Sequence, residues 1–135
     1  MRRLVALALA AAAFAGPVLA TVDAPLTAEG FDALTRGKTM DTATAAGIYG
    51  IESFLPGRKV IWRDAERCVR GSWAQVEDKI CFFYEDKPGV QVCWTYYDRG
   101  DHIEGWYAGP EPVSDPISLT PGASGPVNCD GYLGV

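Results

Sequence analysis

The sequence has little histidine, few basic residues and only one long apolar run, and each shortage narrows the range of functions. His102 is the only histidine among 135 residues and no Gly-x-Ser-x-Gly motif occurs, so we expect neither a serine-type catalytic set nor a metal site. Lys and Arg number 12 against 17 Asp and Glu, which argues against nucleic acid as a partner. Beyond residue 20, no stretch approaches the roughly 20 apolar residues of a membrane-spanning helix.

The first 20 residues have the layout of a secretory signal peptide. Arg2 and Arg3 form a positive start, residues 4–15 are apolar without interruption, and Pro17–Ala20 supplies a helix breaker and small side chains. We therefore expect cleavage after Ala20 and a periplasmic or extracellular location. The remaining residues, 21–135, are few enough for a single domain. Its net charge is near −7, since the leader removes two arginines and no acidic residue.

All four cysteines lie beyond the leader. An exported chain meets an oxidising compartment, so their even number predicts two disulfides. A hairpin turning about Lys87 places Cys81 opposite Cys93, which leaves Cys68 for Cys129. The pairing Cys68–Cys81 with Cys93–Cys129 stays open as the alternative, and we favour the first arrangement.

Capping residues predict one short helix after residue 26. Thr27 is a suitable N-cap, Glu29 lies in the first turn, and Gly37 falls where the helix ends. After this helix, aromatic and β-branched residues alternate with polar ones in runs at 49–54, 59–63, 68–74, 79–84, 90–97 and 103–107. The spacing predicts an all-β fold, an antiparallel meander of about seven or eight strands in a barrel or sandwich. Residues 108–126 contain five prolines and are expected to be a connector outside the core.

The alternation also assigns a core face to the strands. Gly71 and Gly105 lie on this face, at points where a bulky neighbour could cross. Three cysteines lie on the opposite face, so we expect the helix or the C-terminal segment to cover part of it. The predicted core residues are Val60, Trp62, Val69, Trp73, Ile80, Phe82, Tyr84, Val92, Trp94, Tyr96, Ile103 and Tyr107.

Several short motifs resemble those of short exported alphaproteobacterial proteins that form families of unknown function. The motifs are Leu34–Thr39, Tyr49–Glu52, Leu55–Arg58, Cys68–Trp73, Ile80–Tyr84 and Cys93–Trp94. The resemblance implies a small exported β domain and transfers no catalytic residue. The strands around Trp73 and Trp94 are also similar to those of lipocalin-like barrels, which concerns the fold alone.

Taken together, these features favour a non-enzymatic binding or interaction module whose partner is a small molecule or an envelope protein. Tyr97 and Trp106 fall off the main core face and are the predicted ligand-binding residues. No cofactor or metal is predicted. The alternatives are a structural or stress-related envelope protein and a carboxylate-dependent hydrolase, which would need two acids converging in one pocket.

Overall fold

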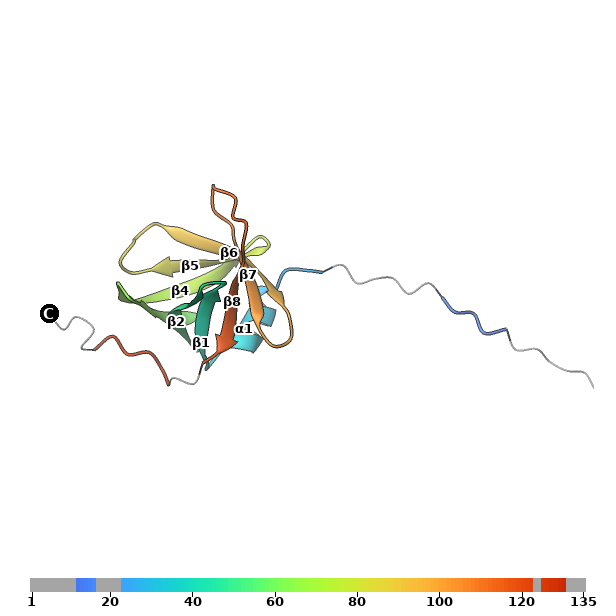
Figure 1. Cartoon of the computed structure of the whole chain (residues 1–135), viewed down its shortest axis with the longest axis horizontal. Helices are drawn as coiled ribbons and strands as arrows, with labels where there is room; N and C mark the ends of the chain where they lie inside the picture. Colours follow the sequence, from blue (N-terminus) through green and yellow to red (C-terminus); the bar gives the residue numbers. More distant parts are fainter. Residues whose placement is uncertain (1–11, 17–22, 123–124, 131–135) are drawn as a thin grey trace, which may run out of the picture.

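The computed structural model describes residues 12–16, 23–122 and 125–130, and its centre is a closed barrel of antiparallel strands (Figure 1). The strands follow one another around the barrel in chain order, and the last pairs with the first. This confirms the expected all-β meander with one short helix. The elements are α1 (Ala28–Thr35), β1 (Thr39–Thr44), β2 (Gly47–Leu55), β3 (Lys59–Asp64), β4 (Cys68–Val76), β5 (Lys79–Tyr84), β6 (Gln91–Asp98), β7 (Ile103–Tyr107) and β8 (Ile117–Pro121).

The predicted signal peptide is only partly described. Residues 12–16 have no regular secondary structure, and the expected cleavage site after Ala20 lies outside the described residues. In the described ranges, no helix is long and apolar enough to cross a membrane.

Helix α1 closes one end of the barrel. The Thr27 hydroxyl accepts a hydrogen bond from the Gly30 N–H at 3.2 Å, and Gly37 follows the helix with a φ of 77°, as the capping pattern predicts. Phe31 has no exposed surface, and its ring stacks on Tyr96 with centroids 4.6 Å apart. A helix of eight residues is marginal alone, so this packing holds it in place.

Two strands, β1 and β8, were not identified individually from the sequence. β8 lies within residues 108–126, so the prediction that this segment stays outside the core is wrong there. Ile117 and Leu119 are 8% and 2% exposed, and the strand pairs with both β1 and β7. Prolines lie on both sides of this strand in the sequence and obscure its pattern, and Pro121 occupies its last position.

The predicted core face does point into the barrel, where most of its residues are buried, but Tyr84, Val92 and Trp94 are only half-buried beside the cavity. Tyr107 is 37% exposed, so its assignment to the core is wrong. β7 ends at Tyr107, at the open end of the barrel, and the ring lies edge-on to Trp94 with centroids 5.3 Å apart. Alternation along a strand predicts which way a side chain faces, and it says nothing of how deep that position lies.

Two disulfides are present, Cys68–Cys129 and Cys81–Cys93, which is the first of the two arrangements that the sequence left open. Cys81 and Cys93 are direct partners in the register of β5 and β6, with Cα atoms 4.0 Å apart. Such bonds persist in oxidising environments outside the cytoplasm.

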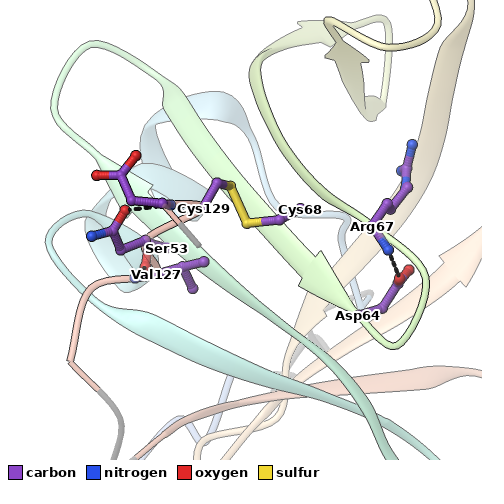
Figure 2. The surroundings of a disulfide bond; sticks show 8 residues. Ser53, Asp64, Arg67, Cys68, Val127 and Cys129 are labelled. Atoms are coloured by element: carbon purple, nitrogen blue, oxygen red, sulfur yellow. Dashed lines mark hydrogen bonds between the residues drawn. A yellow bond between two sulfur atoms is a disulfide. The ribbon is translucent and has the colours of Figure 1, made fainter. Parts of the chain in front are cut away.

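The C-terminal segment lies against the outside of the barrel (Figure 2). The disulfide of Cys129 ties it to the start of β4, and the N–H of Val127 donates to Ser53 Oγ on β2 at 2.7 Å. Val127 is buried there. The C-terminal segment therefore covers part of the outer face, while α1 closes the barrel end.

Candidate ligand-binding site

The barrel end opposite α1 contains a cavity of about 160 Å³. It lies among the first residues of β2 and β6, the last residues of β3 and β5, and the β3–β4 turn, whereas α1 packs near the other ends of these strands. An apolar cavity of about 150 Å³ is large enough for a benzene ring. Six aromatic side chains line its walls: Tyr49, Trp62, Phe82, Tyr84, Trp94 and Tyr96.

Glycines on neighbouring strands leave room for three of these rings, because a side chain at the glycine position would collide with the ring. A Cβ atom at Gly50 would lie 2.3 Å from the Trp62 ring, and one at Gly71 would lie 2.8 Å from the Tyr84 ring. Gly105 receives a third ring in the same way, at 2.6 Å. The prediction that Gly71 and Gly105 are crossing points for bulky neighbours is confirmed. A side chain at any of these glycines would therefore displace the ring beside it.

Glu52 is a carboxyl group inside the barrel. It stands on β2 between Gly50 and Phe54, on the inward face, and is 4% exposed. Tyr84 Oη donates to Glu52 Oε1 at 2.8 Å. The other carboxyl oxygen, Oε2, has no hydrogen-bond partner among the described residues. In the same residues, every side-chain oxygen or nitrogen that is fully shielded from solvent has a partner, so Oε2 is not fully shielded. Oε2 therefore borders the cavity, which Glu52 lines.

Burial sets the protonation state of this carboxyl group. Loss of hydration raises the pKa of Glu52 to about 8, although the Tyr84 hydrogen bond and the charge of Arg67 act in the opposite direction. Glu52 is thus mainly neutral at pH 7. Burial likewise raises the pKa values of Tyr84 and Tyr96 well above 10, with the Glu52 charge adding to the effect.

A second acid, Asp64, lines the cavity at the end of β3. Burial opposes its ionisation, but hydrogen bonds from the Trp62 indole and from the backbone N–H groups of Glu66 and Arg67 outweigh burial and lower its pKa. These bonds measure 2.8 to 2.9 Å, and the one from the Arg67 N–H is drawn in Figure 2. Asp64 therefore shapes the β3–β4 turn while carrying negative charge beside the cavity.

Arg67 is the basic residue of the cavity lining. Its guanidinium carbon lies 5.0 Å from the centroid of the Tyr84 ring, and its Nη1 pairs with Asp86 at 2.7 Å. A cation thus already lies on one aromatic wall, with its charge balanced by a neighbour.

The two residues that the sequence predicted as ligand-binding lie on the outer face of the barrel. The Tyr97 ring lies beneath the Arg99 guanidinium at 5.0 Å, and Trp106 Nε1 donates to Glu104 at 2.8 Å. Neither lines the cavity. They occupy neighbouring cross-strand positions of β6 and β7, and a role in ligand binding stays a prediction.

Sequence reasoning missed Glu52. Acids are common near the ends of strands, and nothing in the type of residue sets Glu52 apart from the other acids of the sequence. The available signal is its spacing, because Glu52 lies two residues before Phe54 and therefore on the same face of the strand as this buried aromatic residue.

Within the described part of the chain, no three His, Cys, Asp or Glu side chains converge as metal ligands. Comparison of the chain with protein-family models, curated proteins and solved structures finds no match. The chemistry of the site must therefore be inferred from its geometry.

Proposed function

We propose that this protein is an exported, non-enzymatic binding module that takes a small ligand into the open end of its barrel. The observation that carries the proposal is an aromatic-lined cavity with a single buried carboxyl group, that of Glu52, on its wall. Protein interiors are otherwise packed to high density, and unfilled space lowers stability. An apolar pocket with one fixed polar group is the usual form of a small-molecule site, in which the polar group orients the ligand.

The size of the cavity limits what it can hold. A volume of about 160 Å³ suits a group of roughly six to eight non-hydrogen atoms. Ile48, Val90 and Val113 lie in or beside the loops at this end and are 65%, 50% and 39% exposed. A longer ligand can therefore extend from the cavity onto apolar side chains.

Ligand-observed NMR with a set of fragments of this size tests the proposal. Thr42→Phe places a ring inside the cavity, since Thr42 lines it, and should weaken binding at least tenfold. Thr95→Phe makes the same change on the outer face of β6, opposite Trp106, and should leave binding unchanged. Circular dichroism and thiol titration establish that both variants fold and keep their disulfides.

Retention of binding in Thr42→Phe would contradict a cavity site. Trp106→Ala would then locate the ligand. Loss of binding in that variant would show that the ligand binds on the outer face of the barrel, as the sequence predicted.

A second candidate function, hydrolysis, is favoured by the two carboxyl groups that line the cavity. Their pKa values are displaced in opposite directions, as in acid–base pairs of hydrolases. Against it, both oxygens of Asp64 already accept hydrogen bonds from Trp62 and the β3–β4 turn. Turnover of 4-nitrophenyl esters or glycosides that disappears in both Glu52→Gln and Asp64→Asn would establish the hydrolase and overturn the binding module.

A further inference from the structure

We propose that the ligand of the cavity is an organic cation, with an alkylated ammonium group held by the aromatic walls and paired with Glu52. This inference rests on the proposed binding function and specifies the ligand class. It combines three features of the cavity: its aromatic faces, the free oxygen of its carboxyl group and the balance of its charges.

The aromatic faces provide the first argument. The face of an indole or phenol ring attracts a cation, most strongly for Trp, and this attraction grows when water is excluded. Trp62 and Trp94 both line the cavity, together with three tyrosines and a phenylalanine. The Arg67 guanidinium over the Tyr84 ring shows that this wall already accommodates positive charge. An alkylated ammonium ion matches such walls because it presents charge through an apolar, weakly hydrated surface.

The carboxyl group provides the second argument. Glu52 Oε1 accepts the Tyr84 hydroxyl, while Oε2 has no partner among the described residues and borders the cavity. Burying an ionised group without a partner is unfavourable. A bound cation supplies the missing counter-charge and needs no further hydrogen-bond acceptor.

The charges around the cavity provide the third argument. Asp64 lines the cavity with a lowered pKa and is ionised at neutral pH. The Arg67 guanidinium also lines the cavity, and its Nη1 is paired with Asp86 at 2.7 Å, which offsets part of its positive charge. An anionic ligand would meet the negative charge of Asp64, whereas a cation meets that charge and also the carboxylate that Glu52 forms as it binds.

Binding of the cation couples to a proton. In the free protein Glu52 carries its proton at pH 7, so the ammonium ion binds as Glu52 releases that proton to solvent and becomes a carboxylate. The base that receives the proton is water or buffer, and no other bond changes. Affinity should therefore rise about tenfold per pH unit below pH 8 and level off above it.

The other groups facing Glu52 do not change charge in this range. Tyr49 on its own strand, Tyr84 on β5 and Tyr96 on β6 have pKa values raised above 10, and Asp64 on β3 has a lowered pKa. Arg67 remains a cation. The inward residues of β1 and β8 that line the cavity do not titrate: Thr42, Ile117 and Leu119.

Calorimetric titration with choline and with its neutral isostere 3,3-dimethyl-1-butanol tests the inference. The two molecules have nearly the same shape and differ by a positive charge. At pH 9 choline should bind at least tenfold more tightly than the isostere. Between pH 8 and pH 6 choline binding should weaken about fiftyfold, while isostere binding stays constant.

Two variants and one measurement on the unmodified protein complete the test. Glu52→Gln should abolish both the preference for choline and its pH dependence, and the same substitution at exposed Glu111 should leave both unchanged. Titrations at pH 7 in buffers of different ionisation enthalpy should show release of about 0.9 proton per choline bound. This last measurement needs no substitution.

Equal affinity of choline and the isostere at pH 9, or choline binding without proton release, would overturn the cation assignment. If neutral fragments still bind and Thr42→Phe blocks their binding, the proposed binding function is retained and only the assignment of a cationic ligand is lost. If neither choline, the isostere nor any fragment binds, both proposals are overturned.

Discussion

Replacing Glu52 by Gln should stabilise this protein, and the gain should grow with pH. The folded state raises the pKa of Glu52 from 4.5 to about 8, chiefly through burial. Below pH 4.5 the carboxyl group is protonated in both the folded and the unfolded chain. Between pH 4.5 and pH 8 the unfolded chain ionises while the folded chain keeps its proton, so the free energy of unfolding falls as the pH rises.

The magnitude follows from the displacement of the pKa. One pKa unit corresponds to about 1.4 kcal/mol, so the displacement from 4.5 to about 8 costs about 5 kcal/mol of stability once the pH exceeds 8. An amide never ionises, and its oxygen can still accept the Tyr84 hydroxyl. Glu52→Gln should therefore match the unmodified protein within about 1 kcal/mol at pH 4.5 and exceed it by several kcal/mol at pH 9.

Urea denaturation followed by tryptophan fluorescence, with disulfides intact, measures this difference at pH 4.5, 6, 7.5 and 9. Glu111→Gln, on the exposed β7–β8 loop, is the matched control and should show no growing difference. A stability difference between Glu52→Gln and the unmodified protein that is constant across this range would refute the reasoning, because it would mean that Glu52 titrates alike in both states.

Three further substitutions should lower stability through other contacts, each measured by the same denaturation assay at pH 7. Tyr84→Phe removes the hydrogen bond to Glu52, which costs about 1–3 kcal/mol and moves the pKa of Glu52 still higher, since that bond lowers it. Replacing Cys68 and Cys129 together by Ser opens a connection between positions 61 residues apart, for which loop closure gives about 4 kcal/mol. Phe31→Ala empties a fully buried site between α1 and the barrel and should cost about 3–5 kcal/mol. A loss below about 0.5 kcal/mol in any of the three would contradict the contact invoked for it.

The strands between residues 49 and 107 could be predicted because their signal is local. Alternation of bulky and polar residues fixes the period of a strand, and Gly and Pro mark the turns between them. The helix was predicted for the same reason, since Thr27 and Gly37 act on the residues beside them. β8 was missed because it contributes only two inward apolar side chains, Ile117 and Leu119, within a proline-rich segment.

The candidate site was hidden for a different reason. Glu52 looks like any acid of a β-rich sequence until the barrel closes around it, and Tyr97 and Trp106 look like site residues until their outward direction is known. A cavity depends on side chains from several strands at once. The sequence of one strand does not predict how far the side chains of the other strands extend into the barrel.

Local patterns in the sequence are enough to predict the class of the fold, the position of most strands, helix α1 and two disulfides among four cysteines. These follow from interactions between residues close in the chain or opposite one another in a hairpin. The closure of β1 on β8, the packing of rings against glycines and the burial of Glu52 become visible only in the folded barrel. Those features arise from contacts between distant strands, and the withdrawal of a carboxyl group from water is a property of the assembled barrel.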